Sequence, residues 1–168
     1  MPKIIENLKD RLLAEARQQL AQGGYGAVTI RSIAKGCGVG VGTVYNYFPS
    51  KEVLIATHLL EDWTVCVDTI RQAADRTECP QEILKCMYDQ LIGFACRHEA
   101  IFRDAAAASG FAGSFSQYHD LLRSQLASPL RKFCDSDFAS EFIAESLLTW
   151  SMAGKSFDEI YEILKKLF

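Results

Sequence analysis

Apolar residues recur along most of this chain at intervals of three and four positions, which places them on one face of an α-helix. No stretch shows the alternation of apolar and polar residues that is typical of a β-strand. The sequence therefore predicts an all-α fold. The longer helices that the spacing predicts cover about residues 4–22, 51–75, 80–98, 115–134 and 138–153, with shorter ones at 100–108 and from Ser156 onward.

Residues 29–48 predict two short helices joined by a tight turn. Thr29 is suited to cap the first helix, because its hydroxyl can accept a hydrogen bond from a first-turn amide. Pro49 ends the second helix, since the residue before a proline avoids the α conformation. A small residue, a glycine and two apolar residues follow the spacing of a helix-turn-helix at Ala34, Gly38, Val39 and Val44.

The second helix of this pair, at about 41–48, carries tyrosine, threonine and asparagine where a solvated helix usually has Glu, Lys or Gln. Asparagine can pair with adenine and a valine can meet a thymine methyl group. Hydroxyl groups suit phosphate oxygens. We therefore expect base contacts from Val41, Gly42, Thr43 and Asn46, and phosphate contacts from Arg31, Tyr45, Tyr47 and Lys51.

Charge is distributed unevenly along the chain. The net charge is −3, but residues 1–51 carry +4 and the remainder carries −7. Arg31 and Lys51 each fall in the first turn of an expected helix, where the helix dipole disfavours a cation unless an external anion binds. A basic N-terminal part favours an anionic polymer such as double-stranded DNA. The alternative is a helical hairpin with incidental surface residues.

The same region resembles the N-terminal DNA-binding domain of the TetR family of transcriptional regulators, over about residues 8–55. The resemblance rests on Thr-Ile-Arg-Ser-Ile-Ala from Thr29, and on Gly-Val-Gly-Val-Gly-Thr-Val-Tyr-Asn-Tyr-Phe-Pro-Ser-Lys-Glu-Val-Leu from Gly38. Two positions depart from the family pattern. Gly40 replaces the usual Ser or Thr cap of the recognition helix, and Val41 replaces a residue that is often polar or basic.

The rest of the chain predicts a regulatory part. No Gly/Pro/Ser-rich linker follows residue 50, so a continuous helix joins a three-helix DNA-binding domain at 1–50 to a helical regulatory and dimerisation domain at 51–168. Pro129 and Gly93 interrupt regular packing, which leaves space for a ligand. Without a charged cluster there, we expect a small apolar or aromatic effector. Candidates for the pocket, most of which could equally be core, are Trp63, Cys66, Met87, Phe94, His98, Phe102, Phe111, Phe115, Tyr118 and His119.

The helix at 138–153 is apolar around much of its circumference, more than one neighbouring helix can cover. This surplus predicts a homodimer in which two helices of each chain form a four-helix bundle. The TetR resemblance implies a dimer interface on the same helices. A fully intramolecular core is the alternative. The interface residues that we expect are Phe142, Ile143, Leu147, Trp150, Ile160, Ile163, Leu164 and Leu167.

Other classes of function find little support. The six cysteines form no C-x-x-C pair, and no histidine pairs with a cysteine at a familiar ligand spacing, so no metal and no cofactor are expected. With no signal peptide and no apolar run of membrane length, we expect a cytoplasmic protein without a membrane partner. No nucleophile motif or paired carboxylate indicates an enzyme.

The sequence thus predicts a ligand-responsive transcriptional regulator, and specifically a repressor, that binds a palindromic operator as a homodimer. Two alternatives remain open. One is a thiol-based redox-sensing regulator on the same fold, and the other is a helical adaptor that binds protein through its N-terminal part.

Overall fold

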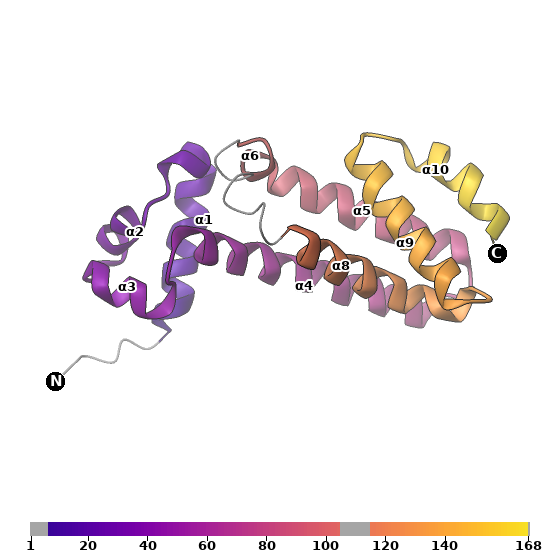
Figure 1. The fold of residues 1–168 in the computed structure, drawn as a ribbon, viewed down its shortest axis with the longest axis horizontal. Coiled ribbons are helices and arrows are strands. Elements are labelled where there is room, and N and C mark those ends of the chain that lie inside the picture. The colour runs from indigo at the N-terminus through magenta and orange to yellow at the C-terminus, as the bar shows by residue number, and fades with distance from the viewer. Residues whose placement is uncertain (1–6, 105–114, 168) are drawn as a thin grey trace. The chain divides into compact units, whose positions relative to one another are not determined.

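The computed structural model describes residues 7–104 and 115–167, and these residues form helices and no strands (Figure 1). The predicted all-α fold is confirmed. Within the described part, no helix is long and apolar enough to cross a membrane. The elements are α1 (Leu8–Ala27), α2 (Ile30–Cys37), α3 (Val41–Tyr47), α4 (Lys51–Arg76), α5 (Pro80–Arg97), α6 (Glu99–Phe102), α8 (Phe115–Ala127), η2 (Ser128–Phe133), α9 (Asp137–Met152), α10 (Phe157–Leu164) and η3 (Lys165–Leu167).

The described residues divide into two compact units. Unit 1 draws on residues 1–61 and 98–112, and unit 2 on residues 62–97 and 113–168. Helix α4 is uninterrupted and contributes residues to both units. Each unit has its own hydrophobic core.

Unit 1 is built on α1, against which α2 and α6 pack, with α3 packed on α2. Helix α1 spans Leu8–Ala27, but its helical geometry breaks at Gly24, with φ 71° and ψ −173°, close to the end of the helix predicted over 4–22. After this break, Tyr25 lies in the core at 3% exposure. Residues 4–6, with which the predicted helix begins, lie outside the described residues.

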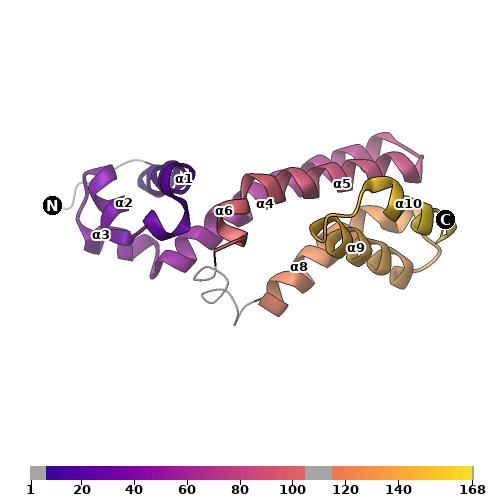
Figure 2. The ribbon, with the colours of Figure 1, turned by 90° about the horizontal axis from the view of Figure 1, so that it is seen from above.

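Unit 2 contains α5, α8, α9 and α10, and α9 packs against each of the other three (Figure 2). The spacing of apolar residues in α9 buries Ile143 and Leu147 completely in this core. Pro129 changes the chain after α8 into the 3-10 helix η2, because proline removes a backbone donor that the α-helix would need. The α-helix predicted over 115–134 is therefore shorter and ends at Ala127.

Two side-chain caps fix the helices of unit 2 that the dimer prediction concerns. The Ser136 hydroxyl accepts a hydrogen bond from the Ala139 amide at the start of α9. At the start of α10, Ser156 and Glu159 form a capping box, since each side chain accepts from the backbone amide of the other. Gly154, at φ 81°, turns the chain between the two helices.

Replacing Glu159 by glutamine is expected to lower the melting temperature at pH 7 and to have little effect near pH 2. The pKa of Glu159 is lowered from 4.5 to about 2, because its carboxylate accepts from the Ser156 amide and the Lys155 ammonium. A depressed carboxyl pKa stabilises the folded state above pH 4.5, and this contribution is lost as the pH falls toward 2. Melting curves of both proteins from pH 2 to 7 test this. Glu162→Gln, which removes only a pair with Lys165, is the control. A gap independent of pH would contradict the prediction.

Candidate nucleic-acid interface

Helices α2 and α3 form a helix-turn-helix with the predicted local chemistry (Figure 1). Thr29 caps α2: its hydroxyl accepts from the Ser32 amide at 2.9 Å, and the Ser32 hydroxyl accepts from the Thr29 amide at 3.0 Å. Gly38 takes the left-handed conformation at φ 67°, which is the reason a glycine is needed at this turn. The Val39 amide then donates to the Ala34 carbonyl at 2.9 Å and closes the turn. Gly40 begins α3 without a side-chain cap.

Helix α1 holds α2 in place through polar contacts as well as apolar packing. The Arg11 guanidinium donates to the carbonyl of Cys37 at 3.1 Å, at the last residue of α2. Near the other end of α2, the Ser32 hydroxyl donates to the Gln19 side chain at 2.6 Å. Both ends of α2 are therefore tied to α1, and α3, which packs on α2, has a rigid support.

The outer face of α3 is uncovered in this chain. Val44 and Phe48 are buried at 0% and 1% exposure, as their spacing predicts. Tyr45 and Tyr47 are 50% and 45% exposed. The predicted base-contact residues lie together on this short helix: Val41, Gly42 and Asn46 are exposed and Thr43 is half-buried. A helix with amide, hydroxyl and small apolar groups outside and an apolar anchor inside fits the major groove of DNA.

The two predicted phosphate-binding cations differ in their surroundings. Arg31 lies in the first turn of α2 and is exposed. Lys51 is half-buried, and its ammonium lies 3.6 Å from the centroid of the Tyr25 ring and donates to the Tyr25 carbonyl. Burial lowers the pKa of Lys51 and raises that of Tyr25, while hydrogen bonding, mainly from Ser50, lowers the pKa of Glu52. No local pattern in the sequence indicates Tyr25 as the partner of Lys51, because the residues are 26 positions apart.

Comparison with known proteins identifies the helix-turn-helix. The family model described as bacterial regulatory proteins, tetR family, matches residues 12–57, which extend from α1 into α4. The HTH-type transcriptional regulator SAR2658 of Staphylococcus aureus is 23% identical over 94% of this chain and 84% of its own length. Residues 12–57 therefore form a DNA-binding domain of the TetR family of transcriptional regulators. The family is one of DNA-binding regulators and not of enzymes.

More distant matches agree on the fold. The HTH-type transcriptional repressor KstR of Rhodococcus jostii is 30% identical over 108 residues. The match covers 60% of this chain and 51% of KstR. The FadR repressor of Thermus thermophilus, a TetR family protein solved in complex with lauroyl-CoA, has a TM-score of 0.65. Its sequence is 20% identical, and the match covers 95% of this chain and 92% of FadR. At this identity the likeness shows a common fold.

The predicted pocket residues are distributed over both units. In unit 2, Trp63, Cys66 and Met87 are buried in or beside the core, and Trp63 donates from Nε1 to Gln125 at 2.6 Å. Phe94 is half-buried and meets Trp63 edge to face, with 5.4 Å between ring centroids. His98 and Phe102 belong to unit 1, where His98 is buried and Phe102 is exposed. Phe111 and the side chain of Phe115 lie outside the described residues.

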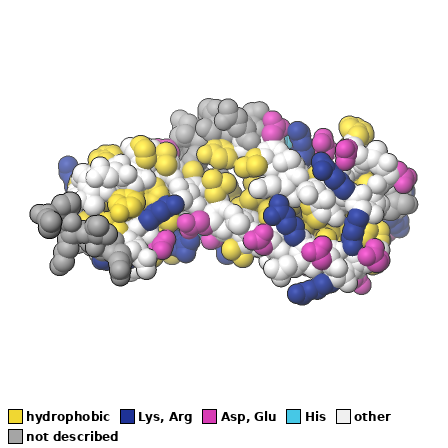
Figure 3. Space-filling model, turned by 90° about the horizontal axis from the view of Figure 1, so that it is seen from below, with side chains coloured by type: hydrophobic (Ala, Val, Ile, Leu, Met, Phe, Trp, Pro, Cys, Tyr) yellow, Lys and Arg dark blue, Asp and Glu magenta, His cyan; other side chains and the backbone are white. Residues whose placement is uncertain are grey.

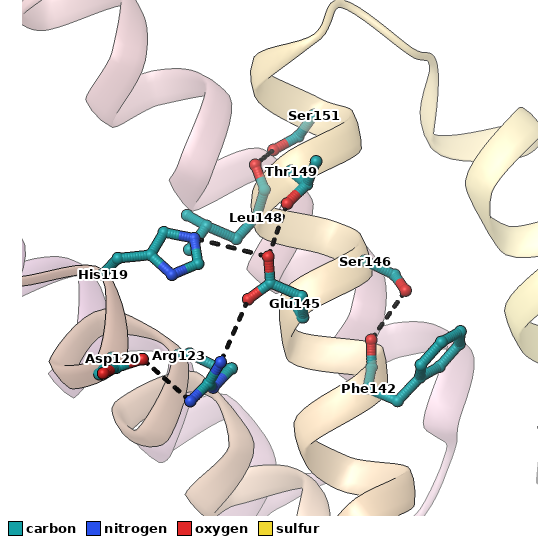
Figure 4. A network of polar contacts seen from close by, with 9 residues as sticks. All are labelled: His119, Asp120, Arg123, Phe142, Glu145, Ser146, Leu148, Thr149 and Ser151. Carbon is teal, nitrogen blue, oxygen red and sulfur yellow. Dashed lines mark hydrogen bonds and ion pairs between the residues drawn. The ribbon is translucent and has the colours of Figure 1, made fainter. Parts of the chain in front are cut away.

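His119 and Tyr118, the last two pocket candidates, are half-buried on α8. Figure 4 shows that His119 points toward α9, where its Nε2 lies 3.5 Å from the Glu145 carboxylate. The same carboxylate accepts from the Thr149 hydroxyl at 2.8 Å and lies 3.9 Å from Arg123. This network joins α8 to α9, so His119 has a structural role whether or not it also meets an effector.

Two histidines of unit 1 pack together. His58 and His98 are buried and their rings meet edge to face, with 5.1 Å between the ring centroids. The Nδ1 atom of His58 accepts a hydrogen bond from Arg17 at 3.0 Å, and Arg17 also pairs with Glu61 at 2.8 Å. The two Arg17 contacts join α1 to α4 within unit 1.

The predicted dimer-interface residues divide into two groups in the single chain. Four are buried in the core of unit 2, namely Ile143, Leu147, Ile160 and Leu164, and four are exposed, namely Phe142, Trp150, Ile163 and Leu167. The surfaces of α9 and α10 border a groove of about 340 Å³ lined by Phe142, Ser146, Trp150, Lys155, Glu159, Ile160, Ile163 and Leu164. An apolar groove flanked by exposed aromatic side chains is typical of a surface that another chain covers.

The face of the molecule drawn in Figure 3 carries interspersed acidic and basic side chains, with hydrophobic side chains between them. No large area of this face has a single sign of charge.

Proposed function

We propose that this chain is a homodimeric repressor that binds a palindromic operator through α3 and releases it when an apolar effector binds. In this proposal residues 1–50 read DNA, and residues 51–168 sense the effector and form the dimer. The observation that carries the proposal is the outer face of α3, where the exposed Asn46 and Gly42 stand on a helix anchored by Val44 and Phe48.

Dimerisation supplies the reason for a palindrome. A two-fold axis through α9 and α10 would present one α3 from each chain, and such pairs read half-sites about 34–36 Å apart. The exposed side chains of Phe142, Trp150 and Ile163 support this interface, with 47%, 51% and 61% exposure in the isolated chain. Selection of bound fragments from random DNA should yield an inverted repeat with that spacing.

Asn46→Ala is expected to reduce operator affinity by on the order of 1–3 kcal/mol and to relax the sequence preference at one position of each half-site. The reason is the loss of a bidentate pair with a base edge. Binding to the operator and to variants with single base changes, measured by gel shift, tests this. Arg31→Gln is the matched comparison, because loss of a phosphate contact should weaken all sequences alike. Equal losses for every sequence in both variants would contradict these roles.

The effector part of the proposal draws on relatives as well as on the chain itself. Bacillus subtilis FadR, 17% identical, was solved in complex with stearoyl-CoA, and the T. thermophilus protein with lauroyl-CoA. Unit 2 of this chain has an aromatic and thioether interior around Trp63, Phe94 and Met87. Long-chain acyl thioesters of coenzyme A, whose acyl chains are apolar, are therefore the first class of effector to test.

Lauroyl-CoA is expected to raise the melting temperature of the protein and to release it from the operator, since an effector must bind the DNA-free state more tightly. The size of the shift follows the effector concentration relative to its dissociation constant. Thermal melts and gel shifts with lauroyl-CoA, and with CoA alone as control, test this. If CoA alone acts equally, the acyl chain is not what the protein recognises.

The burial and the raised pKa values of the thiols disfavour the redox-sensing alternative. Among the described residues the six cysteines are free, and burial raises the pKa of Cys37, Cys66, Cys86 and Cys134. A raised pKa keeps a thiol protonated and slow to react with oxidants.

We expect the proposed regulator to act in the cytoplasm, where the DNA that it binds lies.

A further inference from the structure

Three side chains that can bind a metal ion lie close together at His58, Asp62 and His98. Each offers one ligand atom, and the three atoms lie within 4.8 Å of one another. His58 and His98 are buried at 6% and 3% exposure, and Asp62 is half-buried. In a tetrahedral zinc site with bonds of about 2.0–2.2 Å, neighbouring ligand atoms are about 3.3–3.6 Å apart. Small side-chain rotations are therefore enough to bring the three atoms onto one ion.

Two of these side chains come from the same face of α4. His58 and Asp62 are four residues apart on this uninterrupted helix, which makes them neighbours on its surface. The same spacing supplies two ligands to one zinc ion on other helices. His98 directly precedes α6 and belongs to unit 1 together with His58, whose ring it meets edge to face. The arrangement therefore follows from α4 itself and from the packing of unit 1.

The donor atoms of this group are two imidazole nitrogens and one carboxylate oxygen. Imidazole is the commonest metal ligand in proteins, and it suits zinc and the neighbouring divalent transition ions. Three protein ligands leave at least one position on the ion for water. The Asp62 carboxylate also pairs with Arg97, at 4.0 Å. A carboxylate has about four lone-pair sites, so this ion pair does not prevent coordination.

Arg17 competes with a metal ion for His58. Its Nε donates to His58 Nδ1 at 3.0 Å, and its guanidinium also pairs with Glu61 at 2.8 Å. A neutral imidazole has only one nitrogen that can accept. An ion on Nδ1 would take the lone pair that Arg17 uses, and an ion on Nε2 would require the proton on Nδ1. In either case the Arg17–His58 hydrogen bond is lost, whereas the pair with Glu61 can remain.

We propose that His58, Asp62 and His98 bind a divalent transition-metal ion such as Zn²⁺, and that the bound ion releases Arg17 of α1 from His58 of α4. The site uses none of the residues expected to contact DNA, and its occupancy can be measured without DNA. The inference therefore goes beyond the proposed function and does not depend on it. No local spacing in the sequence indicates the site, because His98 lies far along the chain from the other two ligands.

The experiment measures Zn²⁺ binding to the reduced full chain, without a histidine tag, by isothermal titration calorimetry. We expect one ion per chain. Affinity should fall by at least about 10–100-fold in His58→Gln and in Asp62→Asn, since loss of an outer-shell partner alone costs that much. His119→Gln, a matched histidine substitution in unit 2, should bind like the wild type. Arg17→Met should bind more tightly, because it removes a competing donor and a nearby positive charge.

The visible and near-ultraviolet spectrum of bound Co²⁺ identifies the ligand atoms. Nitrogen and oxygen ligands give d–d bands, whereas a cysteine thiolate adds a charge-transfer band. A charge-transfer band, no binding by the wild type, unchanged affinity in Asp62→Asn, or weaker binding in Arg17→Met would overturn the proposal. If circular dichroism shows that His58→Gln does not fold, Asp62→Asn decides, because that side chain is only half-buried. A chain that binds the ion but no DNA would refute the proposed function alone.

Discussion

Replacing Phe142 and Ile163 together by aspartate is expected to give a folded monomer whose operator affinity is lower by about 10²–10⁴-fold. Both side chains are largely exposed in the single chain, so the substitution leaves the core of unit 2 intact. Aspartates placed in an apolar interface would be buried without partners, which prevents association. The affinity falls because the second half-site no longer binds as an intramolecular event. Sedimentation velocity and gel shifts on the full operator measure the two effects.

Val65→Asp is the matched control for this substitution. Val65 is an exposed apolar side chain of unit 2, at 65% exposure, and it does not line the groove on α9 and α10. The control should remain a dimer with unchanged operator affinity. A Phe142→Asp, Ile163→Asp variant that still sediments as a dimer would show that the two chains meet elsewhere.

Local chemistry explains which parts of the fold the sequence could predict. The caps at Thr29, Ser136 and Ser156 each bond an amide three residues further along, so the signal and its structural effect lie in the same few residues. The positive φ of Gly38 is equally local. The break in α1 is local as well, because Gly24 takes a positive φ of 71° close to the end of the helix that the sequence predicts over 4–22.

Contacts between distant residues explain what the sequence did not predict. No periodicity indicates that the Lys51 ammonium rests on Tyr25, because the two residues are 26 positions apart. Periodicity also cannot tell a chain's own core from its partner's. Ile143 and Phe142 are adjacent apolar residues of α9, but the first is fully buried within the chain and the second is available to another molecule.

The two candidate sites also differ in how far apart their residues lie in the sequence. The residues of the helix-turn-helix lie within one short stretch, and a single turn brings them together. The pocket candidates come from several helices and belong to both units, since His98 falls in unit 1 and Trp63 in unit 2. Aromatic content alone could not assign them to one cavity, because the same side chains also fill cores.

Phe48→Ala is expected to destabilise unit 1 by about 3–5 kcal/mol and thereby to abolish operator binding at physiological temperature. The Phe48 side chain is 1% exposed, and it belongs to the core cluster that also contains Val44, Leu54 and Ile55. Its truncation leaves a cavity where α3 joins the rest of unit 1. Unit 2 has a separate core, so its helices should melt later. Chemical denaturation followed by circular dichroism should therefore show an early transition that the wild-type protein lacks.

Tyr47→Ala supplies the decisive comparison, because it removes an aromatic ring from the neighbouring position on the opposite face. Tyr47 is 45% exposed, so its loss should change stability by less than about 1 kcal/mol. Operator affinity should still fall, since the hydroxyl is expected to contact phosphate. The two variants thus separate the anchoring face of α3 from its reading face. Equal destabilisation by both substitutions would mean that Tyr47 is part of the core and that α3 presents a different surface to DNA.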